Sequence, residues 1–250
     1  MQAAFFVTGT DTGVGKTHVA CALLHATRQL GRTAVGMKPI AAGVEDDGGN
    51  DDVARLLAAS SIQAPMELVN PFLYAPPIAP HIAAREAGRP IDIGAIRRAF
   101  ERLRTLADVV WVEGVGGFRV PLDERYDTAD LAQTLALPVV LVVGMRLGCL
   151  NHALLAAEAI ARRDLTLAGW VANRIDPTMA RFEANLETLR ARLNAPPLLG
   201  VVPYGVSPAQ AAGALRLSEL REFGESQRPP EVSGDANRNM RPAGSRPATS

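Results

Sequence analysis

The feature that most constrains this chain is a glycine-rich loop near the N-terminus, between an apolar run and a stretch of helical periodicity. The apolar run Phe5–Val7 leads into the loop, which ends in Gly15-Lys16-Thr17, and the periodic stretch His18–Leu30 follows. This order predicts a strand, a loop and a helix. Such a loop can point several backbone N–H groups at one anion, and the helix N-terminus adds positive potential behind them. The segment is therefore typical of a phosphate-binding loop.

The side chains that close the loop support a nucleotide as the bound phosphate. The Lys16 ammonium can reach the terminal phosphates of a nucleotide, and the Thr17 hydroxyl can hold the Mg²⁺ that bridges them. The common pattern places four residues between its first glycine and Gly-Lys-Ser/Thr, whereas five residues separate Gly9 from Gly15 here. The longer loop favours a variant subclass over a generic ATPase. An ordinary glycine-rich turn is disfavoured because Gly-Lys-Thr begins a predicted helix directly after a predicted buried strand.

Apolar runs alternate with helix-like stretches along most of the chain. The runs predicted as strands are Phe5–Val7, Thr33–Met37, Val109–Val112, Val139–Val143, Leu167–Ala172 and Leu198–Val202. The stretches predicted as helices are His18–Leu30, Asp51–Ala59, Ile93–Leu106, Thr128–Leu135, Asn151–Arg163 and Thr178–Leu193. Continuous apolar runs are typical of strands buried on both faces. We therefore predict a doubly wound α/β domain over residues 1–224, with a mostly parallel sheet and helices on both faces, similar to phosphate-loop NTPases.

Composition excludes several classes of function. The formal net charge is zero and no basic block is present, so nucleic acid is a poor candidate partner. No run approaches the roughly 20 apolar residues of a membrane span, and no signal peptide is recognisable. The two cysteines, Cys21 and Cys149, lie far apart, and Cys21 is predicted to be a buried thiol in the first helix. We expect a soluble cytoplasmic protein without disulfides.

Two segments rich in proline have a different character. Residues 225–250 contain almost no large apolar side chains, so they cannot bury enough surface to offset their ordering entropy, and we predict a disordered tail. The stretch Pro76–His81 is too short for a linker and is predicted to form a rigid surface loop near the site.

Charged side chains follow two predicted strands and open one predicted helix. Lys38 follows the second strand, and Glu113 ends the strand that precedes Gly114–Gly117. Ligands of parallel sheets bind at the carboxyl ends of the strands, so both side chains are expected beside the phosphate loop. Asp52 opens a helix in Asn50-Asp51-Asp52, where acidic residues commonly cap helices but could also bind Mg²⁺. The sequence does not decide whether Asp51 or Asp52 reaches a metal.

The carboxyl ends of the later strands carry weaker signals. The segment Gly144–His152 runs from a strand into a helix, and its free N–H groups could hold an anion such as a carboxylate, although Asn151 could equally be only a helix cap. Asn173 offers a donor and an acceptor suited to an adenine edge, and Pro203–Gly205 ends the last strand in the same way. The four histidines are scattered without the spacing of metal ligands.

These segments together resemble the dethiobiotin synthetases, over residues 5–204. The segments that carry the resemblance are Val7–Thr12 with Gly15-Lys16-Thr17, Lys38-Pro39, Pro80-His81-Ile82, Val112–Gly117, Leu147–His152, Gly169–Asn173 and Leu199–Pro203. The five-residue spacing in the loop is that family's own form. In combination these segments are specific, although each alone is weak.

The resemblance implies a homodimer and an ATP-dependent ring closure. Its substrates would be 7,8-diaminononanoate, CO₂ or bicarbonate, and ATP with Mg²⁺. A substrate amine would capture CO₂ as a carbamate, ATP would phosphorylate it, and the neighbouring amine would close the ureido ring. Positioning and charge stabilisation carry such a reaction.

The resemblance also implies a role for each residue of the matching segments. Lys38, Lys16 and Thr12 would stabilise the carbamate and the transferring phosphoryl group, and Thr17, Asp52 and Glu113 would serve Mg²⁺. Contacts with ATP would come from Gly13, Val14, Gly15, Lys16, Thr17, His18, Asp52, Glu113, Gly114, Val115, Gly116, Asn173, Arg174, Pro203, Tyr204 and Gly205. Contacts with the substrate would come from Thr12, Lys38, Ala42, Leu147, Gly148, Cys149, Leu150 and Asn151, with the last five near the subunit boundary.

The chain departs from the family at two positions, and two other classes share parts of its pattern. Ala42 and Ala79 stand where the family often has Ser, which puts fine substrate contacts in doubt. Amide ligases of the cobyrinate type usually add a glutaminase domain, for which this chain lacks the length. Positioning ATPases like ParA or MinD carry an extra lysine early in the loop, and Thr10–Thr12 supplies none.

Overall fold

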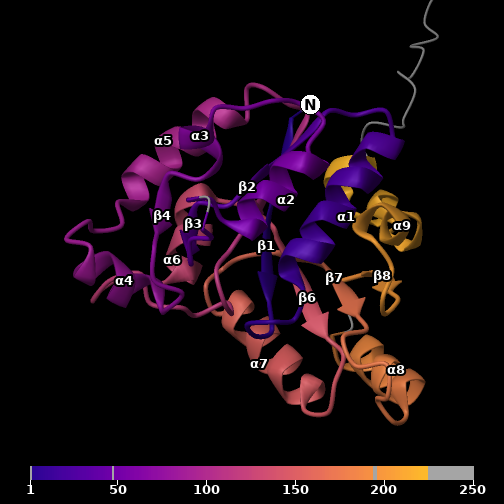
Figure 1. Cartoon of the computed structure of the whole chain (residues 1–250). Coiled ribbons are helices and arrows are strands. Elements are labelled where there is room, and N and C mark those ends of the chain that lie inside the picture. Colours follow the sequence, from indigo (N-terminus) through magenta and orange to yellow (C-terminus); the bar gives the residue numbers. More distant parts are fainter. Residues whose placement is uncertain (1, 47, 194–195, 225–250) are drawn as a thin grey trace, which may run out of the picture.

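A six-stranded parallel sheet forms the centre of the molecule (Figure 1). The computed structural model describes residues 2–46, 48–193 and 196–224, so the predicted tail 225–250 lies outside the described residues. In spatial order the strands are β2 (Ala34–Met37), β5 (Val109–Glu113), β1 (Ala3–Gly9), β6 (Val139–Gly144), β7 (Leu167–Asn173) and β8 (Leu198–Val202). The predicted strands are thus confirmed, with ends shifted by one or two residues. The predicted doubly wound α/β fold is confirmed as well.

The sheet order creates a crevice between β1 and β6. From β1 the chain continues to β2 at one edge of the sheet. From β6 it continues to β7, toward the opposite edge. Ligands of open α/β sheets bind in the crevice outside the carboxyl ends of the strands at such a point. The loop after β1 therefore lies where a ligand is expected.

Strand register brings the predicted charged residues to one level. Val7 of β1 pairs with Glu113 of β5, and Met37 of β2 pairs with Val112. Lys38, one residue beyond Met37, is therefore level with Glu113. The loop that begins after Gly9 of β1 lies next to both.

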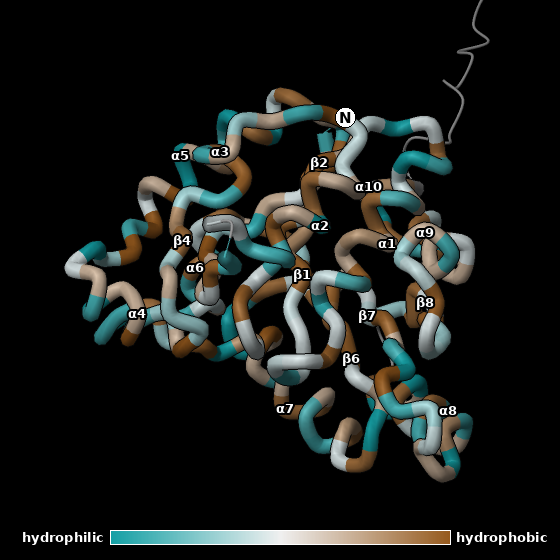
Figure 2. Tube along the Cα trace, viewed as in Figure 1, coloured by the Kyte–Doolittle hydropathy of each residue, from teal (hydrophilic) through white to brown (hydrophobic). Residues whose placement is uncertain are grey.

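Both faces of the sheet are covered by helices, which explains the continuous apolar runs. Phe5 and Val7 pack with α1 (Lys16–Gln29) and α9 (Pro208–Ala211), whereas Phe6 packs on the opposite face. The helices that pack on that opposite face are α5 (Ile93–Leu103), α6 (Thr128–Leu135), α7 (Cys149–Ala161) and α8 (Phe182–Leu193). Figure 2 shows hydrophobic residues along the strands at the centre. Successive side chains of a strand point to opposite faces, so neighbouring residues of the central strands, such as Phe5 and Phe6, are both buried.

The helices match the prediction except at some of their ends. Helix α2 (Asp51–Ala59) has the predicted bounds, whereas α8 begins at Phe182 instead of Thr178. The Asp176 carboxylate accepts hydrogen bonds from the backbone N–H and the hydroxyl of Thr178. These bonds favour a turn there because they compete with the helical backbone pattern.

Several short elements were absent from the sequence prediction. They are β3 (Ile40–Ala42) and β4 (Phe72–Tyr74), which form a second parallel sheet, together with α3 (Met66–Val69), α4 (Pro80–Glu86), α9, α10 (Arg221–Gly224) and two 3-10 helices, Ala212–Ala214 and Leu217–Glu219. The prediction of a loop over Pro76–His81 is wrong for its last two residues, which begin α4. Proline is favoured at the first position of a helix because its missing N–H would have no helical partner there.

The two cysteines and the helix lengths agree with the sequence expectations. Cys21 and Cys149 are both buried and both free, and Cys21 lies in α1 as predicted. Within residues 2–46, 48–193 and 196–224, every helix is too short or too polar to span a bilayer.

Candidate active site

A cavity of about 690 Å³ opens at the carboxyl ends of β1, β2 and β5. Its walls come from the loop after β1, the segment after β5, and the segment that connects β4 to α4. The residues that line it are Thr12, Gly13, Gly15, Lys16, Thr17, His18, Lys38, Ala41, Ala42, Asn50, Asp52, Arg55, Pro77, Ile78, Ala79, Pro80, Glu113, Val115, Gly116 and Val120.

The loop after β1 needs glycine where it turns into α1. Gly15 has a φ of +82° and is the N-cap of α1. A Cβ atom added at Gly15 would lie 2.2 Å from Nδ2 of Asn173. The same Nδ2 donates a hydrogen bond of 2.9 Å to the carbonyl of Val14. Asn173, at the end of β7, thus holds the loop in place. The first N–H groups of α1 have no partner within the helix, so they are available to a ligand.

Thr17 lies between two carboxylates beneath the loop. Its Oγ1 is 2.7 Å from Oδ1 of Asp52 and 2.8 Å from Oε1 of Glu113, so its single proton faces two acceptors. Glu113 is fully buried, and its Oε2 has no hydrogen-bond partner within the described part of the chain. A buried carboxylate oxygen without a donor is unfavourable unless a cation joins it. Two carboxylates and a hydroxyl are the oxygen ligands that Mg²⁺ prefers.

Lys38 bridges the same two carboxylates. Its Nζ lies 2.5 Å from Oε1 of Glu113 and 2.9 Å from Oδ2 of Asp52, and the residue is 4% exposed. Burial alone would lower the pKa of Lys38, but the charges of Glu113 and Asp52 outweigh it and raise this pKa. Burial likewise acts to raise the pKa of Asp52, but Lys38 and the Thr17 hydroxyl lower it. Lys38 is therefore a fixed positive charge at the floor of the cavity.

The Lys16 ammonium is hydrogen-bonded to its own loop. Its Nζ donates a hydrogen bond of 2.9 Å to the carbonyl of Asp11, whose carboxylate pairs with Arg146 at 2.7 Å. Burial and the nearby charge of Lys38 lower the pKa of Lys16 to about 8. An ammonium with a lowered pKa gains from any anion placed beside it, because the anion restores the preference for the charged form.

The structure separates the three polar residues at the start of α2. Asn50 is the N-cap, since its side chain accepts a hydrogen bond from the N–H of Val53. Asp51 is exposed and pairs with Arg55 at 3.5 Å. Asp52 turns to Thr17 and Lys38 instead. Of the two aspartates, only Asp52 lies in the cavity.

The structure brings together some of the predicted contact residues and leaves others outside the cavity. Val115 and Gly116 line it, and so do Ala42 and Ala79, the two positions that depart from the family pattern. The predicted residues outside its lining are Val14, Gly114, Leu147, Gly148, Cys149, Leu150, Asn151, Asn173, Arg174, Pro203, Tyr204 and Gly205. Leu147 is 95% exposed, and the N-cap of α7 is Gly148, so the alternative of Asn151 as the cap is wrong.

Sequence reasoning missed several residues of the cavity wall. Arg55 has the spacing of an ordinary surface residue on a helix, and only its neighbour Asp52 gave a signal. Val120 follows the glycine segment by three residues and is apolar, so no pattern distinguished it. His18, in contrast, is a predicted ATP contact and does line the cavity, and burial followed by the charge of Arg55 lowers its pKa. Within the described residues no group of three histidine, cysteine or acidic side chains is placed to hold a metal.

A family model and named relatives match most of this chain. A family model described as an AAA domain matches residues 3–208. The ATP-dependent dethiobiotin synthetase BioD of Aromatoleum aromaticum is 64% identical over 219 residues, which cover 86% of this chain and 97% of that protein. The protein of the same name from Nitrosospira multiformis is 57% identical over 204 residues, which cover 82% of this chain and 89% of that protein.

Solved structures resemble the fold at much lower identity. The MinD cell division protein of Aquifex aeolicus superposes with a TM-score of 0.50 at 15% identity, and the match covers 89% of this chain and 92% of that chain. A ParA family ATPase from Chlorobium tepidum gives a TM-score of 0.50 at 14% identity, with 90% and 96% covered. At this level of identity the likeness concerns the fold alone.

Proposed function

Since the chain belongs to the family of ATP-dependent dethiobiotin synthetases, we propose that its cavity converts 7,8-diaminononanoate into dethiobiotin. The observation that carries this proposal is the position of Lys38, a buried cation between two carboxylates directly beside a Gly-Lys-Thr loop. The Lys38 ammonium would stabilise the phosphoryl group while it passes from a nucleotide to a second anion.

The proposed reaction has three steps. One amine of the substrate attacks CO₂ and loses a proton, which gives a carbamate. A carbamate oxygen then takes the γ-phosphoryl group of ATP, and ADP leaves. The second amine attacks the carbonyl carbon of this mixed anhydride and loses a proton, phosphate departs, and the five-membered ureido ring closes. The protein's task in each step is to hold two reactants together and to stabilise negative charge.

The loop after β1 would bind the phosphates. Gly15, Lys16 and Thr17 line the cavity at the start of α1, and the Lys16 ammonium donates a hydrogen bond to a carbonyl of its own loop. The first N–H groups of α1 and this ammonium are both suited to phosphate oxygens. Thr12 and Lys38 line the same cavity and would bind the carbamate there.

Thr17, Asp52 and Glu113 fit a magnesium ion bound with ATP. The support is the buried Oε2 of Glu113, which lacks a donor, beside the Thr17 hydroxyl. A magnesium ion held there would offset negative charge on the nucleotide phosphates. Lys38 pairs with both carboxylates and offsets one of their two negative charges.

The adenine and the far end of the substrate would bind outside the cavity. Asn173, Arg174 and the segment Pro203–Gly205 follow β7 and β8, on the side of the sheet beyond the loop. The turn Leu147–Asn151 would take the distant carboxylate of a substrate bound to a second copy of the chain in a homodimer. The 95% exposure of Leu147 supports this arrangement, because an apolar side chain at the tip of a turn is suited to a partner surface.

The other two classes receive less support. The likeness to MinD and ParA proteins extends to the fold only, and the loop lacks the additional lysine of that class. We place the reaction in the cytoplasm, where ATP is available, and expect no membrane or nucleic acid to take part.

Purified protein is expected to form dethiobiotin and ADP when it receives MgATP, bicarbonate and 7,8-diaminononanoate together. Product formation by mass spectrometry and ADP release by a coupled assay measure this. Omission of either bicarbonate or the diamine should reduce ADP release to background, because the phosphoryl acceptor is the carbamate that they form. Steady ATP hydrolysis without the diamine would favour a positioning ATPase, and the absence of dethiobiotin would refute the proposal.

Nucleotide affinity is expected to decline above about pH 8. Lys16 has a pKa of about 8 in the free protein, and its neutral amine cannot pair with phosphate. A bound nucleotide favours the charged form, so the Kd for ATP should be constant below pH 8 and then rise up to tenfold per pH unit. Titration calorimetry between pH 6.5 and 9.5 measures it. The variant Lys16→Met should bind weakly with little change across this range, and an equal pH dependence in that variant would contradict the assignment.

A further inference from the structure

The segment after β5 forms one wall of the cavity and needs an external anchor. It carries Gly114, Gly116 and Gly117, and Gly116 has a φ of +62°. Glycines leave a backbone free to adopt many conformations, so the conformation of this wall must be fixed by contacts elsewhere. Val115, Gly116 and Val120 line the cavity.

The anchor is Thr128, the first residue of α6. Its hydroxyl donates to the carbonyl of Phe118 at 2.6 Å and accepts from the N–H of Val120 at 3.0 Å. Its backbone N–H donates to the carbonyl of Val120, also at 3.0 Å. Thr128 is 1% exposed, so no solvent competes for these bonds. One residue thus fixes the backbone on both sides of Arg119.

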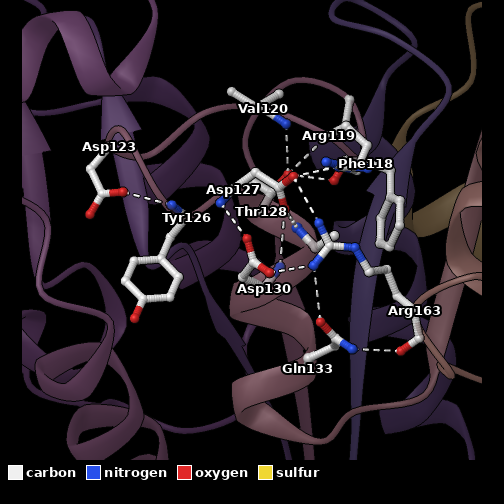
Figure 3. Close-up of polar contacts among 12 residues, drawn as sticks. Phe118, Arg119, Val120, Asp123, Tyr126, Asp127, Thr128, Asp130, Gln133 and Arg163 are labelled. Atoms are coloured by element: carbon white, nitrogen blue, oxygen red, sulfur yellow. Dashed lines mark hydrogen bonds and ion pairs between the residues drawn. The ribbon is translucent and has the colours of Figure 1, made fainter.

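The N-terminus of α6 is itself fixed by charged groups (Figure 3). The Asp127 carboxylate caps the helix, and Asp130 accepts a hydrogen bond of 2.8 Å from the N–H of Asp127. Arg119 pairs with Asp127, while Arg163, just beyond α7, pairs with Asp130 and lies 3.4 Å from Asp127. Thr128 is therefore part of a rigid assembly that connects the wall segment to the end of α7.

The wall meets the phosphate loop at Thr12. A Cβ atom added at Gly116 would lie 2.8 Å from Cγ2 of Val120 and 3.6 Å from Oγ1 of Thr12. Val120 and the Thr12 hydroxyl therefore both lie close to Gly116. A shift of Val120 would change the space beside Thr12, where we placed the carbamate.

We propose that Thr128 is a positioning residue for the ring-closing reaction, acting through Val120 and Gly116 on the part of the cavity beside Thr12. This inference rests on the proposed function. It differs from a purely stabilising role because it predicts a change in turnover per folded molecule.

The test compares Thr128→Val, which keeps the shape and loses the hydroxyl, with Thr128→Ser, which keeps the hydroxyl. Thr134→Val is the matched control, since Thr134 is on the same helix and its exposed hydroxyl donates to the carbonyl of Asp130. At a temperature where all proteins are folded, Thr128→Val should lower kcat at least tenfold and raise the KM for the diamine. Its Kd for ADP should stay within threefold of wild type. Thr128→Ser should keep at least a third of kcat, and Thr134→Val should match wild type.

Two results would overturn the positioning role: an unchanged kcat in Thr128→Val, or an equal loss of kcat in Thr128→Ser. If Thr128→Val does not fold, Val120→Ala decides, because it leaves the backbone bonds of Thr128 in place and removes the wall side chain. It should lower kcat at least fivefold, and an unchanged kcat overturns the proposal. A wild-type protein that forms no dethiobiotin refutes the proposed function and this inference with it, whereas equal activity of wild type and Thr128→Val refutes the inference alone.

Discussion

Replacement of Lys38 by methionine is expected to lower kcat by about 10² to 10³ and to leave nucleotide affinity within a few-fold. Methionine keeps most of the length of the side chain but removes the buried charge that bridges Asp52 and Glu113. Loss of one preorganised charge at a phosphoryl-transfer site costs roughly 3–4 kcal/mol of transition-state stabilisation. Steady-state kinetics with MgATP and the diamine, together with calorimetric titration of ADP, separate the two effects.

Lys38→Met also makes the net charge of the cavity more negative. Without Lys38, the pKa of Asp52 should rise, because burial acts to raise it and Lys38 contributes most among the groups that lower it. Breaking one partner of a buried pair is destabilising by about 3–5 kcal/mol, so the melting temperature should decline and recover in part with Mg²⁺. Lys38→Arg is the companion variant, which keeps the charge with a different geometry. A parallel loss of kcat and ADP affinity in Lys38→Met would make Lys38 a nucleotide-binding residue instead.

The arrangement of the strands made much of this site predictable. Lys38 directly follows one buried strand and Glu113 ends another. Parallel strands align their carboxyl ends at one edge, so the proximity of these residues follows from the sheet. Thr17 joins them because the loop and α1 begin at the same edge. The positions of these residues were predictable because each lies at the end of a regular strand or helix.

Other contacts could not be predicted because they depend on irregular backbone. Asp51 and Asp52 are adjacent in the sequence, and only the rotation of α2 about its axis decides which one faces Thr17. The pair of Asp11 and Arg146 joins two loops across the crevice, and neither loop has a periodic pattern. Thr128 gives no signal at all, since a threonine at a helix start is most often an ordinary polar residue.

Glu113→Gln is expected to lower activity about 100-fold and to raise the Mg²⁺ concentration for half-maximal activity more than tenfold. The change is nearly isosteric, so the core around β5 should remain intact. It replaces a fully buried carboxylate by a neutral amide, which is a much weaker ligand for a divalent cation. It also removes one of the two charges that hold Lys38 in place. Magnesium titrations of the rate at saturating ATP measure the effect.

Two aspartate variants give this prediction its controls. Asp51→Asn removes an exposed carboxylate that pairs only weakly with Arg55, and it should keep activity and the Mg²⁺ requirement within twofold of wild type. Asp52→Asn removes the carboxylate that faces Thr17 and Lys38, so its Mg²⁺ requirement should rise several-fold. An unchanged Mg²⁺ requirement in Glu113→Gln would remove Glu113 from the metal site. Of the two aspartates, only Asp52 lies in the cavity. Equal effects of the two variants would therefore contradict the proposal that the orientation of α2 selects Asp52 as the ligand.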